Sequence, residues 1–206
     1  MITTTLRKIR QHSPCSEGWR TLLTFLGKTG ADDDPLPLVT ILQSNGLDDT
    51  LWCLRTVAGY DKEITRFALA CAQEVRHLMT DQRSLDALDA LARHLESPLS
   101  KQEFDCVLAA AWAAARAARA ARAAVGAAEA ARVAAEAVAW AAEAAQAAQA
   151  EWAAEAAAEA AARSARAAGA AESAAEAAAR SAARARQSQI FEEIFGCTDY
   201  IKSMTD

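Results

Sequence analysis

The sequence predicts an all-α protein, with a compact N-terminal domain of several helices followed by a long alanine-rich helical hairpin or bundle. Residues 109–186 are mostly alanine, with Glu, Arg or Gln recurring every few positions and no proline. Alanine is the best helix former because it loses no side-chain entropy on ordering. Residues 1–100 carry apolar side chains at helical spacing between clear turn signals, and no stretch alternates with the period of two typical of strands. We therefore expect helices and no sheet.

Changes in composition divide the 206 residues into three parts. We expect a helical N-terminal domain over residues 1–100 and an alanine-rich helical region over residues 101–196. Residues 197–206 follow the last apolar cluster and are expected to form a C-terminal tail.

The first two helices have explicit ends. A short opening helix is expected over residues 3–10, and Ser13-Pro14 ends it. The next helix is expected over residues 16–26, with Gly27 just after its C-terminus. Its buried face is predicted from apolar residues at helical spacing, which are Trp19, Leu22, Leu23 and Leu26.

Turn and cap signals also bound the next two helices. Pro35 and Pro37 suit the first turn of a helix, and Asn45-Gly46 is a strong stop signal for it. Asp48 or Asp49 is expected to cap the following short helix.

Two amphipathic helices complete the N-terminal domain. Asp61 is expected to cap the first, whose apolar residues continue at helical spacing to Leu78. Ser84 is expected to start the second, which carries one leucine stripe as far as Leu95. Ser97-Pro98 ends it.

The alanine-rich region begins with a capping box, because Ser100 is followed three residues later by Glu103. As one straight helix, the 78 residues from 109 to 186 would span about 117 Å at about 1.5 Å per residue. Such a helix would leave its alanine face exposed, so we expect the region to fold back on itself. Gly126 and Gly169 are the expected break points.

An apolar cluster follows the alanine-rich stretch near the end of the chain. Its side chains recur on one helical face, and they are Ile190, Phe191, Ile194 and Phe195. We expect this cluster to dock onto the N-terminal helices.

Charge and cysteine content restrict the functional class. A net charge of −5 argues against direct nucleic-acid binding, which requires a basic surface. The five cysteines are scattered without a CxxC pair, and the N-terminus has no apolar signal core. We therefore expect a cytoplasmic protein with reduced thiols and no membrane span. Cys53 and Cys71 lie on apolar stripes and are expected in the core.

No motif with a known chemical role is complete. Gly27-Lys28-Thr29 resembles part of a phosphate-binding loop, but that loop requires a glycine where Leu22 stands. Asp32–Asp34 lacks the glycine turn of a calcium loop, and no set of four ligands has metal spacing. We therefore expect no catalytic residue, no cofactor and no metal. A Cys–His nucleophile pair, or a site assembled in space from Cys and Asp residues, remains an alternative.

Two features are candidate partner-binding surfaces. The acidic loop Asp32, Asp33 and Asp34 is suited to a basic partner. Three tryptophans of the alanine-rich region lie beside charged residues, and Trp and Arg dominate binding hot spots. These tail residues are Trp112, Arg116, Trp140, Glu143, Trp152 and Glu155. The alternative is that each tryptophan covers a seam between helices or packs on the N-terminal half.

The N-terminal half also carries a family resemblance. Three segments together resemble a family of uncharacterised phage and bacterial proteins. They are Ser13-Pro14-Cys15-x-x-Gly18-Trp19-x-x-Leu22-Leu23, Leu26-Gly27-Lys28-Thr29 and Leu47-Asp48-Asp49-x-Leu51-Trp52-Cys53-Leu54-Arg55. A further pattern is similar to toxin-immunity proteins. It consists of Phe67-Ala68-x-x-Cys71-Ala72-x-x-Val75, then residues 81–91 and an alanine-rich tail. The resemblance covers most of residues 13–185. It implies an all-helical intracellular protein of mobile elements that neutralises a toxin or a defence system, and it brings no catalytic residues with it.

The functional expectation is a non-catalytic inhibitor that binds a protein effector, such as a toxin, a nuclease or a host-defence complex, as immunity and anti-CRISPR proteins do. The alternative is a self-associating helical scaffold, with a homodimer as its simplest form and the alanine faces buried between copies.

Overall fold

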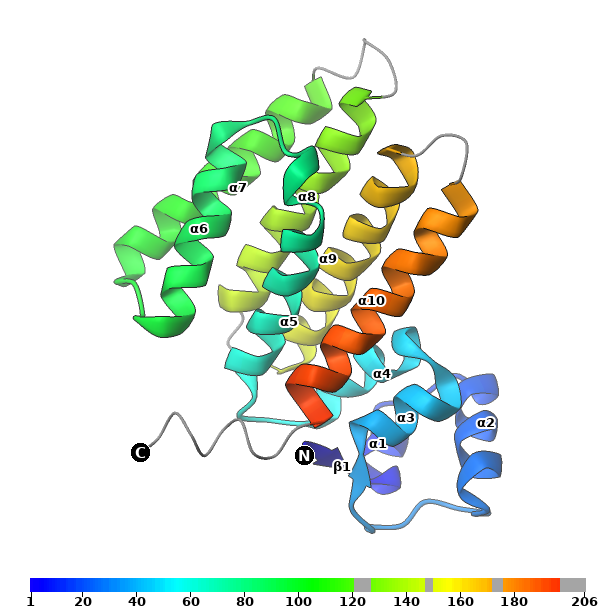
Figure 1. Ribbon diagram of the computed structural model, residues 1–206. Coiled ribbons are helices and arrows are strands. Elements are labelled where there is room, and N and C mark those ends of the chain that lie inside the picture. Colours follow the sequence, from blue (N-terminus) through cyan, green and yellow to red (C-terminus); the bar gives the residue numbers. More distant parts are fainter. Residues whose placement is uncertain (121–126, 147–149, 172–175, 197–206) are drawn as a thin grey trace.

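The computed structural model describes residues 1–120, 127–146, 150–171 and 176–196, and it confirms the all-α fold (Figure 1). The N-terminal lobe, our name for residues 1–53, contains α1 (Leu6–Gln11), α2 (Ser16–Leu26), α3 (Leu38–Asn45) and α4 (Leu47–Cys53). The single-turn helix η1 (Leu54–Thr56), then α5 (Asp61–Glu74), η2 (Arg76–Leu78) and α6 (Gln82–Glu96) follow. The alanine-rich region forms α7 (Lys101–Ala120), α8 (Ala127–Gln146), α9 (Ala150–Ala171) and α10 (Glu176–Gly196).

The absence of a sheet was a wrong prediction, because β1 (Thr3–Thr4) pairs antiparallel with β2 (Leu36–Pro37). The ladder has two residues on each side, which is too short to produce a periodic pattern. Tertiary packing holds it, since the hydroxyl of Thr4 forms a buried 2.6 Å hydrogen bond with that of Thr56. The first helix therefore begins at Leu6, and Pro37 lies in a strand rather than in a helical turn.

Several predicted helix ends were correct and others were displaced. Helix α2 has the expected bounds, and Gly27 adopts the left-handed conformation that suits a glycine after a helix. Two predicted N-caps were wrong, namely Asp48 or Asp49 and Asp61. These residues are in fact in a first helical turn, where a carboxylate also interacts favourably with the helix dipole. The helix expected to start at Ser84 begins two residues earlier, at Gln82. The helix expected to reach Leu78 ends earlier, and that residue lies in η2.

The alanine-rich region folds back into a bundle, as expected. Its capping box is present: the backbone N–H of Ser100 donates to Glu103 Oε2 at 2.9 Å, and the N–H of Glu103 donates to Ser100 Oγ at 3.3 Å. Helix α9 continues through Gly169, so that predicted break was wrong, while Gly126 lies outside the described residues. A helix packed on both sides tolerates one glycine, because its cost of roughly 1 kcal/mol is small beside the burial.

One buried charge network crosses the interface between α8 and α9. Glu136 is fully buried and accepts hydrogen bonds from Arg132 Nη1 at 2.5 Å and from Arg163 Nη1. Arg163 also pairs with Glu159 at 2.5 Å. The surrounding faces are nearly all alanine, whose uniform shape defines axial register poorly. The network therefore marks the position at which the two helices align.

The last helix docks onto the N-terminal half, as expected. Phe191 and Phe195 of α10 are buried and stack at a centroid distance of 4.3 Å. Both rings meet Phe67 of α5 edge to face, at 5.6 and 6.3 Å. The backbone N–H of Ile2 also donates to the carbonyl oxygen of Phe195 at 3.3 Å. The two ends of the described chain are therefore joined in one core.

Candidate binding site in the N-terminal lobe

A glycine allows α2 and α4 to approach closely in the N-terminal lobe. A Cβ atom on Gly18 would lie 2.5 Å from Asp49 Oδ2 and 3.1 Å from Cys15 Sγ. Asn45 at the end of α3 ties these groups together, because its Nδ2 donates to the Gly18 carbonyl oxygen and to Asp49 Oδ2, each at 2.8 Å. Cys15 caps α2, with its sulfur accepting from the Gly18 N–H at 3.3 Å. A polar framework thus fixes one wall of a cavity.

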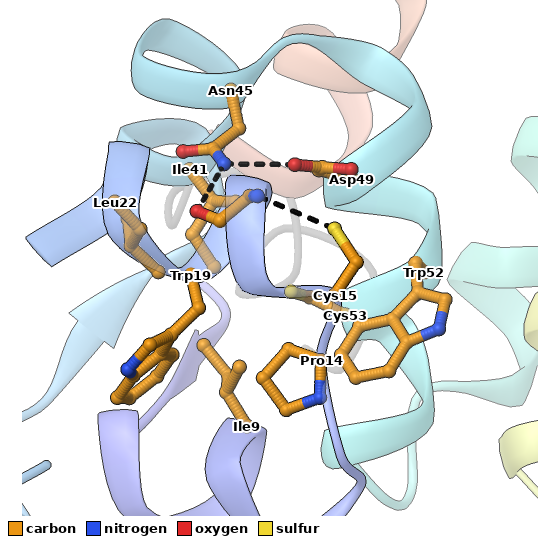
Figure 2. Close-up of a pocket in the computed structure, with 11 residues that line it drawn as sticks. Ile9, Pro14, Cys15, Trp19, Leu22, Ile41, Asn45, Asp49, Trp52 and Cys53 are labelled. Atoms are coloured by element: carbon orange, nitrogen blue, oxygen red, sulfur yellow. Dashed lines mark hydrogen bonds between the residues drawn. The ribbon is translucent and has the colours of Figure 1, made fainter.

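This tryptophan cavity, as we call it, opens between α1, α2, α3 and α4 (Figure 2). Its apolar wall contains Ile9, Pro14, Trp19, Leu22, Ile41, Trp52 and Cys53, and its polar wall contains Cys15, Gly18, Asn45 and Asp49. The cavity volume is about 90 Å³. A single water molecule requires roughly 10–15 Å³ on such a measure, and a cleft for a drug-sized ligand has roughly 300–1,000 Å³. The space therefore suits the end of one side chain.

Two tryptophans define the sides of the cavity. Figure 2 shows Trp19 and Trp52 on either side of Pro14, and both side chains are half-buried. Each ring also carries a guanidinium group: Arg10 lies 5.5 Å from the ring centroid of Trp19, and Arg55 lies 4.6 Å from that of Trp52. Neither arginine lines the cavity. Partly exposed tryptophan with adjacent arginine is the composition typical of binding hot spots.

Asp49 makes the polar wall of the cavity anionic. Its only partner among the described residues is the neutral amide of Asn45. The adjacent Asp48, by contrast, is paired with Arg184 of α10 and does not line the cavity. The carboxylate influences its surroundings: burial, together with the charge of Asp49, raises the pKa of the Cys53 thiol to about 12. Cys53 is therefore a protonated wall residue, and its predicted core position is confirmed.

The acidic loop predicted to bind a partner is matched by cations of the same chain. Lys28 Nζ lies 2.5 Å from Asp32 Oδ2 and 2.8 Å from Asp34 Oδ2, and Arg7 Nε lies 2.8 Å from Asp33 Oδ2. The hydrogen bond from Lys28 lowers the pKa of Asp32. These contacts neutralise much of the field that a basic partner would recognise.

The structure brings three of the predicted tail residues together. Trp112 Nε1 donates to Glu143 Oε1 at 3.1 Å, and the Trp112 ring meets Trp140 edge to face at 5.8 Å. Both tryptophans pack against the core in the seam between α7 and α8. This arrangement corresponds to the alternative in which each tryptophan covers a seam between helices. Arg116 and Glu155 are exposed and separate from this group, while the side chain of Trp152 lies outside the described residues.

Sequence reasoning missed the tryptophan cavity because it assigned Trp19 to the core and Asp49 to a helix cap. The spacing of apolar residues indicates which face of one helix is apolar, but it does not indicate whether two such faces leave a cavity between them. A signal was nevertheless present. The resemblance pattern contains Pro14, Cys15, Gly18, Trp19, Asp49, Trp52 and Cys53, and all of these residues line the cavity.

Comparison with protein-family models, curated proteins and solved structures finds no match to this chain. Within the described part of the chain, no helix is long and apolar enough to cross a membrane. Nor do the described His, Cys, Asp and Glu residues gather in groups of three that would hold a metal ion. The geometry of the N-terminal lobe is thus the basis for a functional proposal.

Proposed function

We propose that this chain is a non-catalytic inhibitor that binds a protein effector, of the toxin or host-defence class, through the tryptophan cavity of its N-terminal lobe. One observation carries the proposal: two half-buried tryptophans, each with an adjacent arginine, frame an open apolar cavity on a rigid polar framework. Hot spots concentrate Trp and Arg around a pocket that the partner fills. The effector class itself comes from the resemblance to toxin-immunity proteins.

Preorganisation supports this role. Asn45 holds the α2 backbone and the Asp49 carboxylate in place, so binding orders few additional groups. A partner that meets a rigid pocket loses less conformational entropy and binds more tightly for the same contact area. Phe25 of α2 is 55% exposed and does not line the cavity, so it offers an aromatic side chain outside the proposed site for comparison.

The scaffold alternative loses its main argument in this fold. It required copies of the chain to cover the alanine faces, but α8 and α9 bury those faces against each other and against α5. Ala137, Ala142, Ala157 and Ala160, for example, are inaccessible to solvent or nearly so. Self-association is therefore not needed to form this core.

Partner capture with matched variants tests the proposal. The double variant Trp19→Ala/Trp52→Ala is compared with wild type and with Phe25→Ala, which removes an exposed aromatic side chain outside the cavity. Captured proteins are identified from host lysate by mass spectrometry, and the leading candidate is purified for titration calorimetry and an activity assay. We expect the double variant to bind at least about 100-fold more weakly, as loss of a hot-spot pair implies, while Phe25→Ala retains most of the affinity.

Two outcomes contradict the proposal. An effector that binds the folded double variant as tightly as it binds wild type would place the interface elsewhere. Binding without any change in effector activity would remove the inhibitor role. Far-ultraviolet circular dichroism of each variant verifies that lost binding does not reflect lost helix.

A further inference from the structure

We propose that the tryptophan cavity receives the guanidinium group of an arginine side chain from the partner protein. This inference rests on the proposed function and names the chemical group that the site selects. It depends on three features of the cavity: two aromatic walls, an anionic wall without a cationic partner, and a volume suited to one side-chain end.

The aromatic walls are suited to a planar cation. A guanidinium group stacks on the face of tryptophan through cation–π attraction, and tryptophan is the strongest partner for it. This chain already uses its two rings in that way, because Arg10 and Arg55 lie over Trp19 and Trp52 from outside the cavity. The same rings line the cavity, where an incoming guanidinium would meet them.

The anionic wall supplies charge complementarity. Asp49 Oδ2 accepts a hydrogen bond from Asn45, while Oδ1 has no hydrogen-bond partner among the described residues. Asn45 also fixes the orientation of this carboxylate relative to the cavity. A guanidinium group donates two parallel hydrogen bonds to a carboxylate, which an ammonium group does not, so the site favours arginine over lysine.

The positive charges around the cavity make the Asp49 carboxylate necessary for binding a cation. Arg10 and Arg55 place positive charge near both tryptophans, and this charge opposes the entry of another cation. The incoming group must therefore gain from stacking and from the carboxylate together. The cavity volume of about 90 Å³ is sufficient for the planar end of one arginine side chain.

The test uses capped amino acids as probes and the purified full-length chain. N-acetyl-arginine amide is titrated while the indole N–H signals of Trp19 and Trp52 are followed by NMR. N-acetyl-citrulline amide is the neutral probe of the same shape. Asp49→Asn removes the charge and retains an acceptor for Asn45. Asp48→Asn is the matched control, because it changes the adjacent residue outside the cavity lining.

We expect saturable shifts of both indole signals with the arginine probe, and an affinity at least about tenfold lower for the citrulline probe or for Asp49→Asn, as expected for a charge-assisted hydrogen-bond pair. The Asp48→Asn variant should match wild type. Equal binding of the two probes, or unchanged binding to folded Asp49→Asn, overturns the inference. Free arginine that binds much more tightly than its capped form also overturns it, because the site would then serve a small molecule.

The two proposals fail in different ways. An effector that is lost from Trp19→Ala/Trp52→Ala but retained by Asp49→Asn leaves the proposed function in place and removes the arginine inference. Specific binding of the arginine probe, combined with an effector that ignores both tryptophans, removes the proposed function instead. The probe titration requires no partner, so it gives an answer in either case.

Discussion

Removal of the buried Glu136 carboxylate should destabilise the protein more than removal of any exposed glutamate in the alanine-rich helices. This carboxylate has no solvent exposure and joins Arg132 of α8 to Arg163 of α9. In Glu136→Ala, the two guanidinium groups lose their shared partner while their side chains remain only 15% and 19% exposed. Arg163 keeps its pair with Glu159, which reduces the penalty for that residue.

The expected magnitude follows from this geometry. Removal of one member of a buried ion pair costs about 3–5 kcal/mol where the remaining charge stays buried without compensation. The partial exposure of both arginines and the retained pair with Glu159 favour the lower end, about 3 kcal/mol. For a chain of this size, that corresponds to a decrease in Tm of about 6–12 °C, at roughly 2–4 °C per kcal/mol.

Urea unfolding followed by circular dichroism at the helix band measures this loss. Glu155→Ala is the matched control, because Glu155 is an exposed glutamate of α9 within the same alanine-rich context. We expect this control to change the free energy of unfolding by less than about 0.5 kcal/mol. If Glu136→Ala and Glu155→Ala unfold at the same urea concentration, the assignment of Glu136 as the register-defining contact of α8 and α9 is refuted.

Three further predictions concern the core and the ionisable groups. Phe191→Ala should lower the free energy of unfolding by about 3–5 kcal/mol in thermal melts, because its fully buried ring packs on Phe67; a loss below about 1 kcal/mol would contradict this packing. Cys53 and Cys71 should resist a thiol-specific disulfide reagent until the protein unfolds, since burial raises the pKa of both thiols and only the thiolate reacts; labelling of either residue in the native state would contradict their burial. Burial also lowers the pKa of His94 below its ordinary value of 6.5, and its Nδ1 accepts from the Leu99 N–H at 3.1 Å. Because the unfolded chain keeps the ordinary pKa, it binds the proton first, and stability should fall as the pH decreases below about 6.5. A His94→Asn variant should show a flatter pH profile in urea titrations, and an unchanged profile would exclude His94 as the source.

Most helices were predictable from sequence, whereas most of the side-chain contacts between helices were not. Helix α2 has its predicted bounds because an apolar stripe and Gly27 are local signals. The capping box at Ser100 and the docking cluster around Phe191 were likewise local patterns. The predicted site residues depended on long-range placement instead: Trp112, Trp140 and Glu143 meet in one seam, whereas the acidic loop is paired with Lys28 and Arg7.

By itself, the sequence determined that this protein is helical, that its alanine-rich half folds back, and that Cys53 and Cys71 are buried. These properties follow from backbone propensity and from apolar periodicity, both of which act over a few neighbouring residues. Only the tertiary structure decided that Glu136 joins two alanine faces and that Gly18, Asn45 and Asp49 fix a cavity wall. Those arrangements depend on how close two helices approach and on which side chains face the gap, and residues distant in the sequence set both.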